Sequence, residues 1–424
     1  MNEVKNKCRY FSYYGWECPY EALEDSKDGF CIFHEKRKNK DIKKFNDGIK
    51  KILEDKDTDA YHFEGFFFPI AMNFADQKFK KNTYFTMAEF IGGDTTFQWA
   101  EFSGRETYFN GVKFKGESVN FFKAKFAGEN TYFTGTEFKG KTIKFTGTTF
   151  EAFNTDFSNT EFEAENTFFV GAKFLGNAVN FYDSRFIKTV WFDRTIFDAK
   201  TCFTNIDLSR CVLLNVDLRN VDLNRLSWDW DYKIGNETEL EKVQGMLKLR
   251  RQELYFRTSE IYQQLKVHFY NKRDFAKVGL FHFREQECKR RACELPRDFF
   301  KWVLLWILKL SCGYGEKLMN VVLTSLALIF LFALGYMFVG LYNTDNGLVF
   351  NYDLGFTNIT PIFTTLKDFG TSLVFSAKGF FPLWRFQQYK VVGNCANTIA
   401  GLEVLLGAFM VGLFIYVFRR RMDK

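Results

Sequence analysis

The stretch 85-FTMAEFIGGDTTFQWAEFSGRETYF-109 repeats a unit of twelve residues, and this unit determines the fold. Two phenylalanines in each unit lie five residues apart, and the next unit begins seven residues later. Outward from this stretch the same spacing continues without interruption over 18 positions, which are Phe85, Phe90, Phe97, Phe102, Phe109, Phe114, Phe121, Phe126, Phe133, Phe138, Phe145, Phe150, Phe157, Phe162, Phe169, Phe174, Phe181 and Phe186. Neither the helical period of about 3.6 nor the alternation of a simple strand gives this spacing, so it predicts a solenoid of stacked coils.

Small or β-branched residues accompany the phenylalanines, as Thr83 and Ala88 do in the first unit. Residues i and i−2 of an extended segment point to the same side, so we expect each Phe and its partner to share the interior. Coils stacked about 4.8 Å apart would place equal positions in columns. Glycine also recurs two residues after the second Phe, where we expect it to provide backbone freedom for a wider corner; these residues are Gly92, Gly104, Gly116, Gly128, Gly140 and Gly176.

After Ile206 the period shortens to five residues, in IDLSR, CVLLN, VDLRN and VDLNR. This pattern resembles the pentapeptide-repeat family, and the Phe units resemble a looser version of the same repeat. The resemblance covers about 63–223 and implies a right-handed quadrilateral β-helix, which we expect over residues 59–228. It implies a scaffold or sensor with a cytosolic protein partner. Because 63–223 contains 18 basic and 20 acidic residues, it lacks the strongly acidic surface of DNA mimics, and we expect no nucleic-acid partner.

Four residues near the N-terminus, Cys8, Cys18, Cys31 and His34, form the pattern C-x9-C-x12-C-x2-H. A C-x2-H half places a thiolate and an imidazole on one turn, as tetrahedral zinc requires, and no other Cys occurs in the first 200 residues. Four protein ligands leave no open position, so we expect structural zinc rather than a catalytic metal; the alternative is a set of scattered reduced cysteines. We assign 1–58 to this zinc knuckle and to a charged amphipathic helix over 35–53 that caps the solenoid.

The region after the solenoid is basic and helical. Residues 229–295 contain Y-x-x-LK at 262–266 and resemble one tetratricopeptide-type helix pair. From Asn236 to Lys317 there are 17 Lys and Arg against 11 Asp and Glu, which favours contact with anionic lipid headgroups. FFKWVLLWILKL at 299–310 is too short to span a bilayer, so we expect an interfacial helix within 296–316.

Two apolar stretches in 317–424 predict transmembrane helices. Residues 321–341 carry no charge, and 391–418 carry only Glu403 before Arg419, Arg420 and Arg421. Each is long enough for a hydrocarbon core of about 30 Å. Basic residues gather before the first and after the second stretch, so we expect a plasma (inner) membrane protein whose N-terminal domain and C-terminus are both cytoplasmic.

The order of helix, short apolar segment and helix in about 313–421 resembles two-transmembrane ion channels. SLVFSA at 372–377 takes the place of the re-entrant pore helix, and the last apolar stretch that of the inner helix. No TVGYG-like filter follows, so potassium selectivity is not implied. The resemblance implies a homo-oligomer, by analogy a tetramer, and the pore or pore-loop candidates are Ser372, Ser376, Lys378, Gly379, Glu403, Gly407 and Gly412.

Two of these residues allow alternatives. Glu403 would either line the pore or, near the outer end of its helix, cap the pore-loop helix or reach water, since an intramembrane carboxylate is costly and by default functional. Lys378 would be either a selectivity charge or a contact to headgroups.

The sequence favours an oligomeric ion channel that is non-selective or of unknown selectivity, in which the solenoid is the sensor or scaffold. The alternative is a membrane-anchored scaffold without pore activity. No nucleophile elbow, phosphate loop or HExxH pattern is present, so we expect no enzyme.

Overall fold

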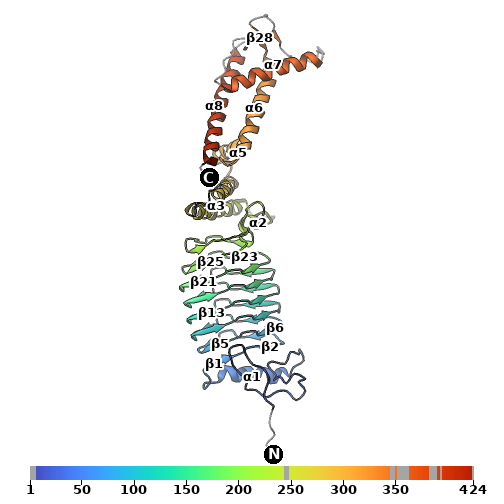
Figure 1. Ribbon diagram of the computed structural model, residues 1–424, viewed down its shortest axis with the longest axis vertical. Helices are drawn as coiled ribbons and strands as arrows, with labels where there is room; N and C mark the ends of the chain where they lie inside the picture. Colours follow the sequence, from blue (N-terminus) through green and yellow to red (C-terminus); the bar gives the residue numbers. More distant parts are fainter. Residues whose placement is uncertain are drawn as a thin grey trace, which may run out of the picture. The chain divides into compact units, whose positions relative to one another are not determined.

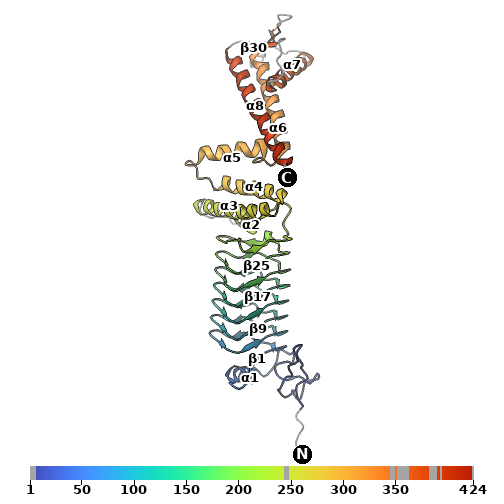
Figure 2. The same cartoon turned by 60° about the vertical axis from the view of Figure 1, so that its left-hand side comes forward.

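The computed structural model describes residues 6–242, 248–343, 349–350, 362–381, 389–391 and 394–422 (Figure 1). The chain divides into two compact units, 1–268 and 269–424. The first unit contains a parallel β-solenoid and its caps, and the second is mainly helical (Figure 2).

The solenoid consists of four parallel sheets, one for each side of the coil. The first contains β1 (Ala60–His62), β5 (Asn82–Tyr84), β9 (Glu106–Tyr108), β13 (Asn130–Tyr132), β17 (Asn154–Asp156), β21 (Ala178–Asn180), β25 (Lys200–Cys202) and β27 (Val221–Asp222). The second contains β2 (Phe67–Phe68), β6 (Glu89–Phe90), β10 (Lys113–Phe114), β14 (Glu137–Phe138), β18 (Glu161–Phe162) and β22 (Arg185–Phe186). The third contains β3 (Met72–Asn73), β7 (Thr95–Thr96), β11 (Ser118–Asn120), β15 (Thr142–Lys144), β19 (Asn166–Phe168), β23 (Val190–Trp191) and β26 (Cys211–Val212). The fourth contains β4 (Lys78–Phe79), β8 (Glu101–Phe102), β12 (Lys125–Phe126), β16 (Thr149–Phe150), β20 (Lys173–Phe174) and β24 (Ile196–Phe197).

One full coil of the solenoid contains two of the twelve-residue units. Phe114 pairs with Phe90 on one side and Phe138 on the other, so equal positions recur every 24 residues. The five-residue repeats form the last coil, where Thr201 pairs with Val221. The predicted four-sided coil is therefore confirmed, with a longer circumference in the Phe region than in the pentapeptide region. The right hand of the coil, which the family resemblance implies, stays a prediction.

The interior is filled by four columns of fully buried Phe rings. In the column from Phe85 to Phe181 the centroids of successive rings lie 4.7 to 4.9 Å apart and nearly parallel. Rings of neighbouring columns meet edge to face, as Phe121 and Phe133 do at 5.7 Å and 89°. The predicted core residues occupy these columns, and both geometries are favourable for aromatic pairs.

Buried hydroxyl groups complete the interior at the position two residues before the second Phe. The Oγ1 atoms of Thr136, Thr148 and Thr160 each donate to a Phe carbonyl of the preceding coil, at 2.7 Å. These bonds satisfy the hydroxyls, so Thr can replace Ala here without leaving a buried polar group unpaired.

The recurrent glycines have a different role from the one expected. Among the six, only Gly140 has a positive φ, so the set does not supply left-handed corners. The left-handed residues instead lie two positions after the first Phe, in the five-residue gap, and they are Met87, Trp99, Gly111, Lys123, Gly135, Gly147, Asn159, Gly171 and Asp183. Gly is needed two residues after the second Phe because successive coils touch there: a Cβ at Gly116 would lie 1.9 Å from the Gly93 carbonyl oxygen, and one at Gly128 2.1 Å from that of Gly104.

Helices cover both open ends of the solenoid. At the first coil α1 (Ile42–Glu54) buries Phe45, Ile49 and Ile52. The helix starts seven residues later than the predicted 35, because the Asp41 side chain caps it by accepting from the Lys44 N–H. At the last coil α2 (Gly235–Lys242) and α3 (Lys248–Asn271) provide polar side chains. These side chains accept hydrogen bonds from backbone N–H groups that a further strand would otherwise pair.

Hydrogen bonds between side chains of α2 and α3 and the backbone of the last coil contribute to this C-terminal cap. The Asn236 Oδ1 atom accepts from the Leu213 N–H at 2.7 Å, and the Gln264 Oε1 atom accepts from the Leu218 N–H at 2.8 Å. The Leu213 and Leu218 N–H groups at the free edge of the last coil are therefore paired with side chains, which protects them from pairing with another chain.

The second unit contains α4 (Phe275–Ala292), α5 (Phe299–Cys312), α6 (Leu318–Val339), α7 (Ile362–Phe380) and α8 (Asn394–Met422), with a small sheet of β28 (Leu341–Asn343), β29 (Val349–Phe350) and β30 (Tyr389–Val391). The predicted helices all exist, although α7 is far longer than the predicted 372–377. Helices α6, α7 and α8 pack against one another, with Val321, Ile329, Phe380, Met410 and Val417 at the centre.

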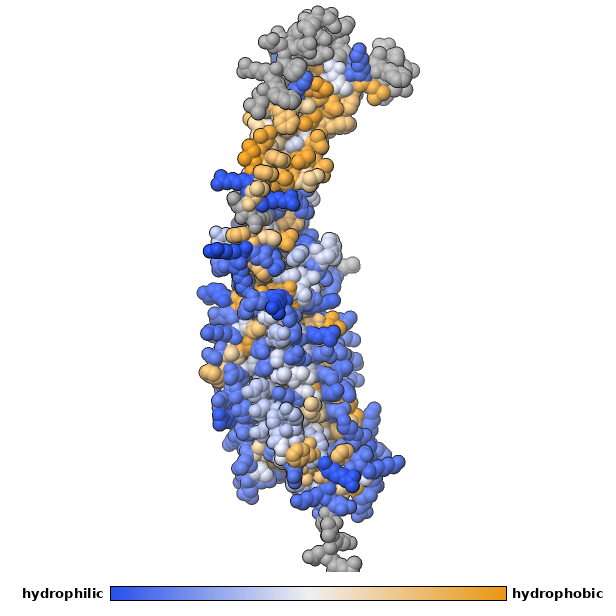
Figure 3. Space-filling model, viewed as in Figure 1, coloured by the Kyte–Doolittle hydropathy of each residue, from blue (hydrophilic) through white to orange (hydrophobic). Residues whose placement is uncertain are grey.

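Two helices are long and apolar enough to cross a membrane, α6 over Leu318–Val339 and α8 over Asn397–Met422. Only 28% and 22% of their apolar windows are buried, so both carry most of their apolar side chains on the outside. Figure 3 shows this as an apolar surface over α6 and α8, in contrast to the hydrophilic surface of the solenoid.

Candidate functional site

The candidate metal centre lies next to the first coil and brings together the four predicted ligands. Cys8, Cys18, Cys31 and His34 are all buried, and their ligand atoms lie within 4.8 Å of one another. The Sγ atoms of Cys18 and Cys31 are 3.7 Å apart, and His34 Nδ1 lies 3.5 Å from Cys8 Sγ and 3.3 Å from Cys31 Sγ. Zinc bonds of about 2.3 Å to sulfur and about 2.0 Å to nitrogen give tetrahedral edges of about 3.5 to 3.8 Å. These residues therefore fit a tetrahedral metal such as zinc.

The surroundings of His34 favour the same interpretation. Its Nε2 atom lies 2.8 Å from the Glu64 carbonyl oxygen, so this nitrogen carries the proton and Nδ1 keeps its lone pair for a metal. The Tyr10 ring stacks on the imidazole at 3.9 Å, and the Phe66 ring meets it edge on at 5.1 Å. Burial, reinforced by Glu64, raises the pKa of Tyr10 to about 12. The imidazole is thus fixed in tautomer and in orientation.

Lys40 joins the N-terminal module, which is the segment 8–34 with the four candidate ligands, to the solenoid. Its ammonium donates to the carbonyl oxygens of Phe33 and Phe67, at 3.2 and 2.8 Å, and lies 5.1 Å from the centre of the Phe45 ring. Burial lowers the pKa of Lys40 to about 7. No sequence pattern marks this residue, because it follows the exposed Lys36 and Lys38 in a basic run.

A second site lies where α6, α7 and α8 pack together. Glu403 is 1% exposed, and its Oε2 atom accepts from the Tyr336 hydroxyl at 2.5 Å. The Ser376 hydroxyl contacts Glu403 Oε1 and also lies 2.8 Å from the Ile329 carbonyl oxygen. Each of the three helices therefore contributes to this polar cluster, which we define as Tyr336, Ser376, Glu403 and the Ile329 carbonyl.

Close backbone contacts surround the polar cluster. A Cβ at Gly379 would lie 3.0 Å from Glu403 Oε2, and one at Gly407 would lie 2.0 Å from the Phe380 carbonyl oxygen. Lys378 and Gly379 lie in the last turn of α7, so the chain does not leave the helix where a filter was considered. Ser372 is buried one turn before Ser376 on α7, and its Oγ atom has no partner in the described part of the chain. Gly412 alone among the three candidate glycines faces open space.

Glu403 and Ser376 of the polar cluster, and Gly379 and Gly407 beside it, were therefore among the candidates predicted from the sequence, whereas Tyr336 was not. The only signal for Tyr336 was a phenol within an uncharged stretch of 21 residues.

A network around Glu287 in α4 was also missed. This carboxylate is buried and accepts from Arg290 at 2.5 Å, from Lys309 of α5 at 3.0 Å and from the Tyr314 hydroxyl at 3.1 Å. Burial alone would raise the pKa of Glu287, but the hydrogen bonds and charges of Arg290 and Lys309 outweigh it and lower the pKa to about 2. The network fixes α5 on α4.

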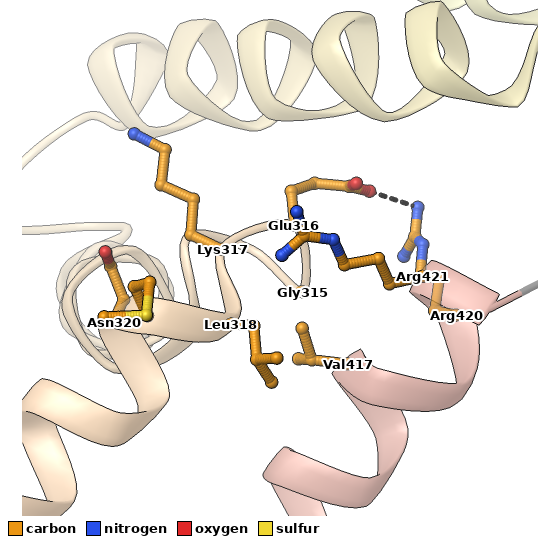
Figure 4. A pocket seen from close by; sticks show the side chains of 9 residues that line it. Gly315, Glu316, Lys317, Leu318, Asn320, Val417, Arg420 and Arg421 are labelled. Carbon is orange, nitrogen blue, oxygen red and sulfur yellow. Dashed lines mark ion pairs between the residues drawn. The ribbon is translucent and has the colours of Figure 1, made fainter. Parts of the chain in front are cut away.

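A pocket of about 360 Å³ lies between the start of α6 and the end of α8 (Figure 4). Arg420 and Glu316, both in its wall, form an ion pair of 2.6 Å. The pocket therefore shows that the first and last turns of the two apolar helices lie side by side.

No protein-family model, curated protein or solved structure matches this chain.

Proposed function

We propose that the chain is a subunit of an oligomeric membrane pore and that the solenoid is its cytosolic scaffold or sensor. The observation that carries this proposal is the polar cluster, in which a helix between two span-length apolar helices is fixed to both by a buried carboxyl group. A pair of helices that served only to anchor the chain would need no such internal helix and no buried acid, which is costly in a membrane.

Exposure of the apolar helices supports insertion into a bilayer. Helix α8 exposes Leu405 and Ile415 by 70% and 60%, and α6 exposes Leu323 by 60%. A core helix of a soluble protein would bury such side chains. These surfaces fit lipid tails or further copies of the chain.

The ends of the two helices support a topology with both termini on the cytoplasmic side. Arg420 at the end of α8 pairs with Glu316, which directly precedes α6, and Lys317, Arg419 and Arg421 lie in the same region. Basic residues on one side of a helical hairpin favour the cytoplasmic side, here of the plasma membrane.

One helical hairpin cannot enclose a pore, so the proposal requires a homo-oligomer, by analogy a tetramer. Since α8 buries Glu403, Gly407, Met410 and Val417 against its own chain, another face of α8 would line the pore. Gly412, the one open glycine among the candidates, lies on such a face. Ion selectivity is left unassigned, because no potassium-filter sequence is present.

The test is electrical. The purified chain in planar bilayers should give reproducible single-channel steps. Cysteine substitutions at Leu402, Leu405, Phe409, Gly412 and Ile415 should show block by a charged thiol reagent at a subset spaced three to four residues apart. Met410→Cys, which is 3% exposed, is the matched control, and the wild type with the reagent provides the baseline for the native cysteines. Electrical silence together with a monomeric mass in detergent would contradict the pore.

That outcome would favour the second candidate, a membrane-anchored scaffold with a cytosolic protein partner. The solenoid supports this second candidate, because its four sheets present a long regular surface for a protein partner. The same surface is available to the solenoid of a pore subunit.

We further propose that Cys8, Cys18, Cys31 and His34 hold a structural zinc ion that fixes the N-terminal module on the first coil. The full-length chain should contain one zinc per chain by elemental analysis, and Cys31→Ser should lose it, whereas Cys202→Ser, in the solenoid, should not. Chain without metal but with an unchanged melting temperature would contradict this role.

A further inference from the structure

Glu403 is the only fully buried acidic side chain among the described residues of α6, α7 and α8. Its hydrogen-bond partners are Tyr336 of α6 and Ser376 of α7. The other titratable or charged side chains described on these helices are Lys367, Asp368 and Lys378 on α7 and Tyr416, Arg419, Arg420 and Arg421 near the far end of α8. No hydrogen bond or ion pair joins any of them to Glu403 in the described part of the chain.

The hydrogens of the polar cluster can be counted. The Tyr336 hydroxyl has one hydrogen and donates it to Glu403 Oε2. The Ser376 hydroxyl also has one hydrogen, yet it lies within hydrogen-bond distance of two acceptors, Glu403 Oε1 and the Ile329 carbonyl oxygen. An ionised Glu403 would leave one of these two contacts without a hydrogen.

A protonated Glu403 removes this deficit. The carboxylic acid then donates from Oε1 to Ser376 Oγ, Ser376 donates to the Ile329 carbonyl, and Tyr336 donates to Oε2. Every hydrogen is used once and every contact is a bond. An ionised carboxylate would in addition lie in an apolar interior without a counter-ion, which is unfavourable.

We propose that Glu403 is a proton-binding site that holds α6, α7 and α8 together. In this packing the carboxyl group carries its proton, and loss of the proton loosens α7 from its two neighbours. By linkage, any change that separates α7 from α8 weakens proton binding to the same extent. The site exists whether or not the assembly conducts ions, so it goes beyond the proposed pore.

Infrared spectroscopy of the full chain in lipid vesicles tests this site directly. At pH 7 exposed carboxyl groups are ionised, so a carbonyl stretching band of a protonated acid should remain with the area of one group per chain. Glu403→Gln should remove the band, whereas Glu117→Gln, whose side chain is 70% exposed, should leave it. Tyr336→Phe should shift it to higher wavenumber, because the carbonyl oxygen loses its hydrogen bond.

Raising the pH adds a second measurement. The wild-type band should disappear at alkaline pH together with a fall in the melting temperature, and Glu403→Gln should not show that fall. Absence of the band from the wild type at pH 7, or a band that Glu403→Gln retains, would overturn the proposal. If Glu403→Gln does not fold, the Tyr336→Phe shift still decides. The band without single-channel steps would contradict only the pore, and steps without the band only the proton site.

Discussion

The interiors of the two units are built on opposite principles. The solenoid core uses one side chain repeatedly, so that Phe109, Phe133 and Phe157 have nearly identical surroundings in successive coils. The core of α6, α7 and α8 depends on contacts that occur once, above all those of Glu403 and Gly407. Stability in the solenoid is therefore distributed over equal positions, whereas the arrangement of the helices depends on a few groups.

The largest effect is expected in the middle of a Phe column. Phe133→Ala removes a ring that stacks on both neighbours, and it should lower the free energy of unfolding by about 3 to 5 kcal/mol. Chemical denaturation of the full chain, followed by circular dichroism, measures this. Phe153→Ala is the control, because Phe153 lies on the same solenoid and is 56% exposed. Equal losses from both substitutions would show that the columns do not carry the stability.

A comparable effect in the second unit should come from Glu287. Glu287→Gln removes the negative charge that the partly buried Arg290 and Lys309 face and should destabilise α4 and α5 by about 3 kcal/mol at neutral pH.

The pH dependence of this network has a defined sign. The folded pKa of Glu287, about 2, lies below its ordinary value of 4.5. Its contribution is therefore complete above about pH 4.5 and is lost as the pH falls toward 2. Thermal melts from pH 7 to pH 2 should show a drop in this window that is smaller in Glu287→Gln. A wild type and a variant with parallel pH profiles would contradict the assignment.

Smaller effects are expected at the contacts between coils. Gly128→Ala places a Cβ against the Gly104 carbonyl oxygen and should cost about 1 to 3 kcal/mol through displaced backbone. Gly135→Asn should be nearly neutral, because Asn159 occupies the equivalent left-handed position one coil later. Thermal unfolding of both variants checks this contrast, and a neutral Gly128→Ala would mean that the coils can separate without cost.

The smallest effect should come from the outer face of the solenoid. Arg105→Gln breaks an exposed ion pair of 2.5 Å with Glu129 and should change the melting temperature only slightly. The change should vanish in high salt, since solvent ions screen such pairs. A loss that equalled the Phe133→Ala effect would reverse the comparison between core and surface.

The sequence predicted the solenoid well because each of its interior positions repeats in the chain. The period of twelve identified the columns, but not that two units complete one coil, since equal side chains on two opposite sides of a coil look alike in sequence. The glycines were interpreted as corners because a sequence does not distinguish a positive φ at Gly135 from a close contact at Gly128.

The helical site and the metal site were predictable only in part, because their residues do not repeat along the chain. Glu403 was conspicuous as the single charge in an apolar stretch, and the four metal ligands were conspicuous by their residue types. Tyr336, Lys40 and the Ile329 carbonyl act through contacts distant in the chain, and no local pattern marks them.

The closed ends of the solenoid have a consequence for its length. Because α1 caps the first coil, α2 and α3 cap the last, and the middle coils repeat every 24 residues, the caps do not depend on the number of middle coils. Duplicating residues 109–132 would insert one complete turn and separate the caps by about 4.8 Å more, with every column intact. The number of repeats in the sequence therefore sets the distance between the two caps, in steps of one coil.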